Sequence, residues 1–159
     1  MNTNRNVRGG FTLVEVLLVI AIIGILAGVF IFTVGGSQDQ AKKDTTVLLI
    51  EQVSTALERY KLNIGDYPTD AEGGLDALIA KPSYTDEKLA EKWAGPYIMS
   101  DPIDGWGNKL GYEPTEAGSE EAQALPYKVW SYGPNKQDDS GADDDIKNKA
   151  WIQSEAANG

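Results

Sequence analysis

The chain has 159 residues, with 24 acidic and 14 basic side chains and a formal net charge of -10. It contains neither cysteine nor histidine. This composition excludes disulfides, thiolate nucleophiles, histidine-based triads and metal sites built on imidazole or thiolate ligands. The negative charge also argues against nucleic acid as a partner, because the phosphates would be repelled.

An apolar segment dominates the N-terminal part of the chain. Residues 1–10 are polar with two charges, Arg5 and Arg8, and residues 11–34 carry a single charge, Glu15. The apolar run of about 24 residues makes a helix of roughly 36 Å, enough to cross a hydrocarbon layer of ~30 Å. The preceding arginines predict a cytoplasmic N-terminus, with the rest of the chain on the other side of the membrane. The run is too long for the apolar part of a secretory signal peptide.

The apolar run continues into a second helical pattern. Apolar residues recur there at spacings of three and four, which predicts one apolar face. They are Leu49, Val53, Leu57 and Tyr60. Because no proline occurs before Pro68, one helix is predicted from about Thr12 to about Leu62, with Gly35-Gly36 as its weak point.

Beyond Leu62 the composition changes, since all the prolines and tryptophans lie there. Asn63 to Asp66 is typical of a helix stop and turn. A short helix is predicted at 74–80 and a helical turn within 83–93. Strands are predicted at 109–113 and 127–132, with a turn at 104–108 before the first. From Asn135 onward we expect an acidic loop, ending in a last strand at 150–152.

Glu15 has two interpretations. An acidic side chain costs on the order of 2.5–3.5 kcal/mol at the centre of a bilayer, and less near the end of a span. The chain is either a plain anchor whose Glu15 reaches the interface, or a subunit whose Glu15 has a partner. If the chain were cut after Gly10, the new α-amine of Phe11 would be positive, and a neighbouring copy could present it to Glu15.

The segment Arg8-Gly9-Gly10-Phe11-Thr12-Leu13-Val14-Glu15 resembles the N-terminus of the type IV pilin and pseudopilin family. The resemblance implies that a prepilin peptidase cleaves after Gly10 and methylates the new amine of Phe11. It also implies that Glu15 acts in assembly. One departure is Phe32, where the family often has a helix-kinking proline.

Further segments, in the same order along the chain, resemble the major pseudopilins of type II secretion systems, the G type. They are 56–69 with its Tyr67-Pro68-Thr69 turn, 74–78, 95–98, 104–107, 131–134 and 144–146. At 104–107 the family favours Asp-Pro-Trp-Gly, and this chain has Gly105 in place of the proline.

The resemblance implies an α+β fold, in which a long N-terminal helix, transmembrane in its first half and amphipathic in its second, packs on a small antiparallel sheet with a C-terminal calcium loop. It implies a cleaved leader at 1–10, a transmembrane and filament-core helix at 11–34, and a periplasmic domain at 35–159. The protein would be no enzyme. It would be a single-pass subunit of the bacterial inner membrane that joins a periplasmic filament driving protein export across the outer membrane. Its implied partners are further copies of itself, minor pseudopilins, the prepilin peptidase and the inner-membrane assembly platform.

The acidic loop is a candidate calcium site. Its carboxylates supply hard oxygen ligands in a short stretch, which suits calcium, although the spacing is not that of an EF-hand. A merely solvated acidic run is the alternative. The resemblance implies ligation by Asp144 and Asp145, by the backbone carbonyls of Tyr132 and Ala142, and by Asn135 where the family has an aspartate. Additional candidate ligands are Asp138, Asp139 and Asp143.

Two other functions remain open at this level. A type IV pilin of a surface filament, used in adhesion, motility or DNA uptake, would share the N-terminal segment, but many such pilins close a C-terminal loop with a disulfide. A membrane-anchored hydrolase would need two carboxylates facing across a cleft. The acids here lie mostly in one stretch near the C-terminus, which disfavours the hydrolase.

Overall fold

The structure is a computed structural model, which describes the backbone of residues 12–158 and the side chains of residues 12–27 and 38–157. The chain divides into two compact units with the boundary between Gln38 and Asp39. The expected cleavage site at Gly10 and Phe11 lies outside the described residues. No helix in the described part of the chain has a segment that is long and apolar enough to cross a membrane.

Helix α1 (Leu13–Ile64) confirms the prediction of one long N-terminal helix. Its backbone stays helical at Gly35 and Gly36, where the sequence suggested a weak point. The helix ends where expected, because Gly65 adopts a left-handed φ of 112° and its N–H donates to the carbonyl of Lys61 at 2.8 Å. Such a glycine is a common helix C-cap, since only glycine takes this conformation without steric cost.

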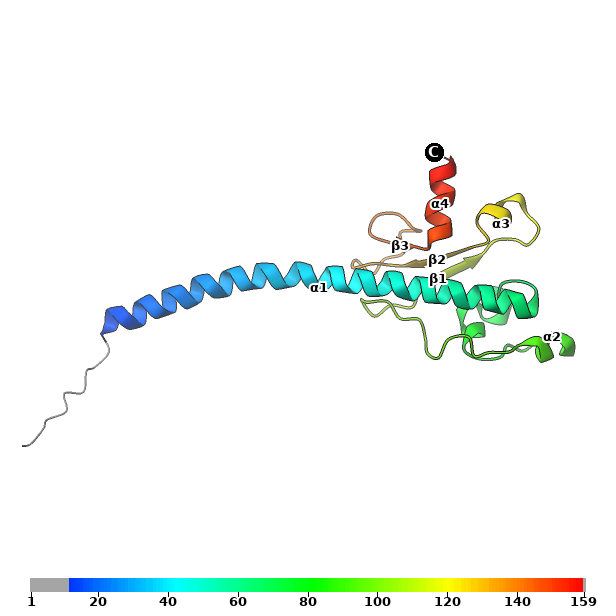
Figure 1. Ribbon diagram of the computed structural model, residues 1–159, viewed down its shortest axis with the longest axis horizontal. Coiled ribbons are helices and arrows are strands. Elements are labelled where there is room, and N and C mark those ends of the chain that lie inside the picture. The colour runs from blue at the N-terminus through cyan, green and yellow to red at the C-terminus, as the bar shows by residue number, and fades with distance from the viewer. Residues whose placement is uncertain (1–11, 159) are drawn as a thin grey trace, which may run out of the picture. The chain divides into compact units, whose positions relative to one another are not determined.

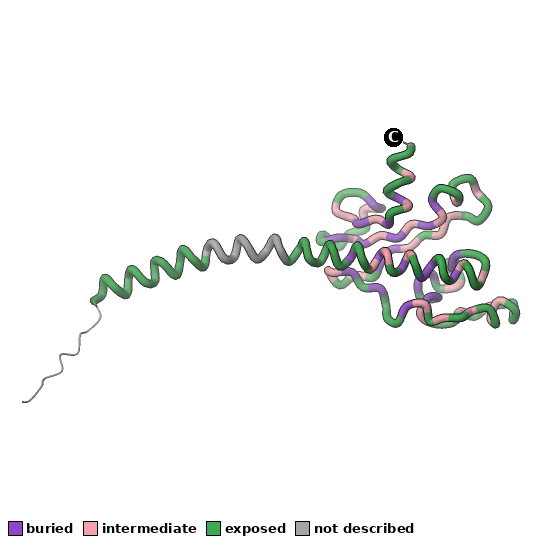
Figure 2. The backbone as a smooth tube through the Cα atoms, in the orientation of Figure 1, coloured by how far each residue is buried: buried purple, intermediate pink, exposed green. Residues whose placement is uncertain are grey.

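The second half of α1 supplies one wall of the core of the unit that begins at Asp39. Its buried residues recur at helical spacing, as predicted, with Leu49 only half-buried. They are Thr46, Ile50, Val53, Ala56, Leu57 and Tyr60. Among the positions of α1 that Figure 2 colours by burial, the buried ones all lie in this half of the helix.

Short helices follow α1 and lead to the sheet. They are η1 (Asp70–Glu72), η2 (Gly74–Leu78) and α2 (Glu87–Lys92), and a further one, α3 (Glu120–Ala124), interrupts the strands. The helices expected within 74–80 and 83–93 are thus present, the first as a 3-10 helix. Helix α3 was not predicted, although Ser119 caps it by accepting the N–H of Ala122.

The sheet has three antiparallel strands in the order β1 (Gly111–Pro114), β2 (Tyr127–Ser131) and β3 (Ile146–Lys147). Both predicted strands are present. Strand β2 alternates buried and half-buried residues, so that Tyr127 and Val129 face the core. Figure 1 shows β1 and β2 alongside the second half of α1, with which they share the apolar core. The antiparallel sheet and long helix confirm the α+β class.

The predicted last strand at 150–152 is wrong. These residues belong to helix α4 (Lys149–Asn158), and the third strand is β3, inside the stretch predicted as loop. The strand was inferred from Trp151 and Ile152, which are typical of β-structure. Their neighbours Ala150, Gln153 and Glu155 are better helix formers. The helix begins where Asn148 leaves the sheet, because its carbonyl accepts the N–H of Ile152 at 3.2 Å.

Candidate functional site: the C-terminal acidic loop

The loop of residues 132–145 is closed at its base by the sheet. Ser131 at the end of β2 pairs with Ile146 at the start of β3, so the two ends of the loop are held together without a covalent bond. The path between them needs several left-handed residues, at which φ is positive. They are Gly133, Lys136, Ser140, Gly141 and Asp143. The backbone of this loop is therefore tightly turned.

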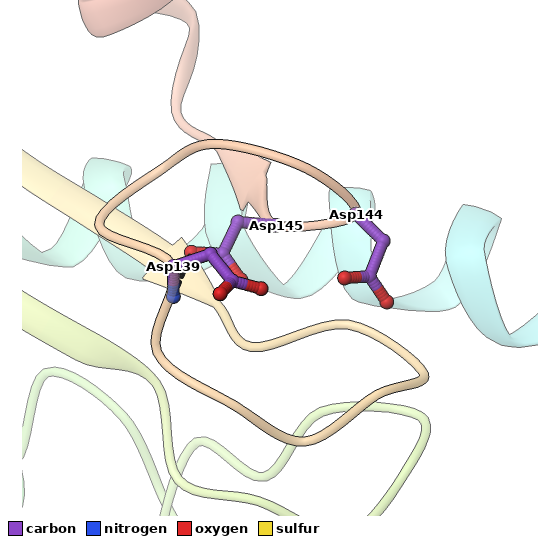
Figure 3. Close-up of side chains that lie close together, drawn as sticks. All are labelled: Asp139, Asp144 and Asp145. Atoms are coloured by element: carbon purple, nitrogen blue, oxygen red, sulfur yellow. Dashed lines mark hydrogen bonds between the residues drawn. The ribbon is translucent and has the colours of Figure 1, made fainter.

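Three carboxylates converge inside the loop. One oxygen each from Asp139, Asp144 and Asp145 lies within 4.8 Å of the other two, and all three side chains are half-buried. Figure 3 shows the carboxylates of Asp139 and Asp145 next to each other, with that of Asp144 to one side of them. Like charges at such distances repel one another, and partial burial removes some of the water that would screen them.

Two buried oxygens of this cluster have no hydrogen-bond donor among the described residues. They are Asp144 Oδ1 and Asp145 Oδ1. The other oxygen of each of these two side chains accepts backbone amides. Asp144 Oδ2 accepts the N–H of Asn135 at 2.9 Å. Asp145 Oδ2 accepts the N–H groups of Asp139 at 3.1 Å and of Gly141 at 2.8 Å.

Burial raises the pKa of the Asp145 carboxyl above its ordinary value, because the charged form loses hydration, and the two backbone N–H groups offset only part of this. A buried acceptor without a donor costs free energy. A hard cation would supply the missing interaction at both Asp144 Oδ1 and Asp145 Oδ1. These carboxylate oxygens therefore fit the coordination of a divalent ion that prefers oxygen ligands.

The other predicted ligands lie at different places in the loop. Asn135 lies against the cluster, because its side-chain amide donates to Asp139 Oδ2 at 2.7 Å, while its side-chain oxygen accepts the N–H of Gln137. The carbonyl of Ala142 accepts the N–H of Asp145 at 3.0 Å. Tyr132 is half-buried at the start of the loop.

Two of the additional candidates do not join the cluster. Asp138 is exposed, and its Oδ1 accepts the indole N–H of Trp130 at 3.1 Å. Asp143 is exposed as well. The third carboxylate of the cluster is therefore Asp139, which the sequence analysis gave only as an additional candidate ligand, together with Asp138 and Asp143. Nothing in the sequence pattern separates Asp138 from Asp139, since they are neighbours in an acidic stretch.

A buried polar network supports the start of the loop, and sequence analysis did not identify it. The N–H of Gly133 donates to Ser131 Oγ at 3.1 Å, and Ser131 Oγ donates to Asp104 Oδ2 at 2.7 Å. Asp104 also accepts the N–H groups of Trp106 and Asn108. The turn predicted at 104–108 thus does more than reverse the chain, because its buried carboxylate fixes the residue from which the loop departs.

The fold of the loop should depend on the absence of a side chain at Gly133. A Cβ at Gly133 would collide with the carbonyl oxygen of Asp144. The φ of Gly133 is 63°. Gly118 has a φ of 82° and open space around it. Both alanine variants carry the left-handed strain, so the difference between them reports the collision alone. We expect Gly133→Ala to lower the free energy of unfolding by about 1–3 kcal/mol more than Gly118→Ala, measured by denaturant titration of the full chain in detergent. Equal losses would contradict this close contact.

At the other end of the described chain, Glu15 closes the first turn of α1. Its carboxylate accepts the N–H of Thr12 at 2.9 Å and the hydroxyl of Thr12 at 3.0 Å, and the hydroxyl in turn accepts the N–H of Glu15 at 3.2 Å. This reciprocal arrangement is a capping box. The apolar side chains from Leu13 to Leu26 are exposed on all sides of the helix, and Leu13 is 77% exposed. Glu15 therefore has a local partner within its own chain.

Comparison with known proteins identifies the family. Residues 33–149 match the family described as "Type II secretion system (T2SS), protein G", and residues 5–31 match the prokaryotic N-terminal methylation motif. The type II secretion system core protein G of Aeromonas hydrophila is 38% identical over 141 residues, covering 89% of this chain and 92% of the relative. The protein of the same name from Pseudomonas aeruginosa is 35% identical over 149 residues, covering 92% of this chain and 97% of the relative.

A solved structure agrees. The major pseudopilin from the type 2 secretion system of enterohaemorrhagic Escherichia coli superposes with a TM-score of 0.51 at 26% identity, covering 71% of this chain and 90% of that one. The fold, the sequence of the globular unit and the N-terminal motif thus lead to one assignment. The chain belongs to the protein G family of type II secretion systems, the major pseudopilins.

Proposed function

We propose that this major pseudopilin is a structural subunit whose acidic loop is closed by a calcium ion. The observation that carries the calcium proposal is the pair of buried, donor-free oxygens on Asp144 and Asp145, which converge with Asp139. Asn135 and the carbonyls of Tyr132 and Ala142 complete the proposed ligand set. Calcium suits it better than magnesium, because calcium tolerates irregular shells of six to eight oxygens, whereas magnesium demands a small octahedral shell.

In this chain the bound ion would neutralise three carboxylates that form no ion pair with a basic side chain among the described residues. The three carboxylates repel one another, and the chain has no cysteine with which to close the loop. The protein itself prepares the place, because the backbone amides of Asn135, Asp139 and Gly141 already hold two of the carboxylates. The loop is thereby oriented before any ion enters, and the ion removes the remaining repulsion.

The N-terminal segment supports a second part of the proposal, which concerns processing and assembly. The chain would be inserted through residues 11–34 in the inner membrane, with its globular part in the periplasm. Prepilin peptidase would cleave after Gly10 and methylate Phe11. The match to the methylation motif and the apolar composition of residues 11–34 support this order. The mature subunits would join copies of themselves and minor pseudopilins at an assembly platform, with their apolar helices in the filament core.

Processing predicts a defined mass and N-terminus. Protein recovered from its native membrane should begin with N-methylated Phe11, and its formal charge should change from -10 to -12 because Arg5 and Arg8 are removed. Intact-mass spectrometry with N-terminal sequencing measures both. Gly10→Leu should block the cut, since the side chain next to the scissile bond becomes bulky, whereas Gly9→Ala should be processed as usual. An assembled protein that retains Met1 would contradict the proposal.

A further inference from the structure

Helix α4 lies beside the acidic loop, and most of it lies beyond residue 149, where the match to the protein G family ends. Of its side chains at 149–157, the one that is strongly buried is Trp151, which is 9% exposed. The adjacent Ile152 is 51% exposed. Burial in this helix is thus concentrated in one large aromatic residue, and its neighbours show what it is buried against.

Trp151 packs on the loop at Gly141. A Cβ built on Gly141 would lie 2.5 Å from the indole ring, so the ring fills the place of a side chain. Gly141 has a φ of 81°, and its N–H donates to Asp145 Oδ2 at 2.8 Å. The indole of Trp151 therefore lies against the residue whose amide holds a carboxylate of the cluster.

A second tryptophan holds the same part of the loop from strand β2. The ring of Trp130 meets that of Trp151 edge to face, with centroids 5.8 Å apart and an angle of 82°. Its indole N–H donates to Asp138 Oδ1, which also accepts the N–H of Ser140. Residues 138–141 are thus fixed at one end by a hydrogen bond from Trp130 and at the other by contact with Trp151.

Charged side chains hold Trp151 in place. The ammonium groups of Lys128 and Lys147 lie 5.5 and 5.2 Å from the centroid of its ring, within the range of cation–π attraction. Lys147 also pairs with Glu155 on α4, and Lys149 at the start of α4 pairs with Glu51 on α1. The helix is therefore tied to both the sheet and α1, and displacing the indole from Gly141 would break its cation–π contacts with the two lysines.

We propose that Trp130 and Trp151 form an aromatic clasp that holds residues 138–141 in the conformation needed to bind the cation. Trp151 is a positioning residue, because it acts through the Gly141 amide and does not touch the carboxylates as a ligand. Ordering the loop before the ion arrives lowers the entropy lost on binding, which raises affinity. The cation-binding part of this inference rests on the proposed calcium site, whereas the ordering of the loop by the clasp does not.

The test compares Trp151→Ala with Ile152→Ala, an apolar truncation at the adjacent exposed position, in the full chain in detergent. Calcium affinity is measured by titration calorimetry. Trp151→Ala should weaken calcium binding about tenfold or more, since the variant must order the loop on binding, and Ile152→Ala should bind like the parent. Trp151→Phe should recover part of the affinity, because a ring again covers Gly141.

Hydrogen exchange in chelator supplies a readout that needs no calcium. The amides of Asp139 and Gly141 should exchange faster in Trp151→Ala than in the parent, while those of Val53 and Leu57 in α1 report whether the fold survives. If Trp151→Ala unfolds, Trp130→Phe serves instead, because it keeps the ring and removes the hydrogen bond to Asp138. Parental exchange at Gly141 in a folded Trp151→Ala protein would overturn the clasp. If the parent protein binds no calcium, but the amides of Asp139 and Gly141 still exchange faster in Trp151→Ala than in the parent, only the calcium site is overturned and the clasp stands.

Discussion

Replacing Glu15 with alanine should leave the chain in the membrane and nearly abolish its assembly into filaments. Insertion should be unchanged or improved, because the substitution removes a charge that is unfavourable in lipid. Assembly should suffer, because the proposed partner of the Phe11 amine is lost in the neighbouring subunit. Removing one member of a buried charge pair costs about 2–5 kcal/mol, so the docking equilibrium should fall by about 30-fold or more. Immunoblotting of the membrane fraction and of sheared filaments separates the two effects.

The capping box in α1 makes a sharper control possible. In Glu15→Gln the side chain still caps the N–H of Thr12, but the negative charge is gone. In Thr12→Ala the charge remains and half of the box is lost. If Glu15 acts by pairing with an amine, the glutamine variant should fail like alanine and Thr12→Ala should assemble. If Glu15 only closes the helix, Glu15→Gln should assemble normally, which would refute the pairing.

Calcium should raise the melting temperature of the full chain in detergent, relative to the same protein in chelator. An ion that binds only the folded state stabilises it by roughly 2.7 kcal/mol at a hundredfold excess over its dissociation constant. Asp144→Asn and Asp145→Asn should each remove most of this gain, because an amide replaces a carboxylate that carries a donor-free oxygen. Magnesium should give a smaller increase, since it gives up its water reluctantly. Circular dichroism at 222 nm would follow the melt.

Two variants within the same loop calibrate this result. Asp143→Asn removes an exposed carboxylate at a left-handed residue, a conformation that asparagine also tolerates, so the calcium effect should persist. Asn135→Asp should enlarge the effect, because Asn135 already contacts Asp139 and would bring another negative charge to the ion. Identical melting temperatures in calcium and chelator for the parent would leave the acidic loop as a solvated surface.

The sequence was most informative where one physical pattern extended over many residues. The spacing of Val53, Leu57 and Tyr60 predicted the buried face of α1. The aromatic and β-branched residues within 127–132 predicted strand β2. Helix α4 was misjudged because Trp151 favours a strand by propensity, whereas in the structure it is buried by packing on Gly141. That contact joins residues whose proximity depends on the fold of the whole loop.

The candidate site was predicted only in part, because its remaining residues are also defined by contacts between distant parts of the chain. Asp144 and Asp145 followed from resemblance, but the choice of Asp139 over Asp138 depends on the indole of Trp130, which holds the latter outside the cluster. Asp104 was read as part of a turn, and its bond to Ser131 spans 27 residues. Long-range polar contacts of this kind leave no periodic trace in a sequence.

The two walls of the core, α1 and β2, lie far apart along the chain, and this separation affects how the protein can fold during its synthesis. The hydroxyl of Tyr127 reaches the carbonyl of Ser54 across 73 residues, and Val129 joins the same core. A ribosome makes α1 long before it makes β2. The apolar face of the helix therefore stays exposed while some seventy further residues are synthesised. Strand β3 and helix α4 are synthesised later still. The last fifth of the chain is needed to complete a core that its first half begins, so nascent chains halted before Tyr127 would offer that bare face to chaperones or to one another.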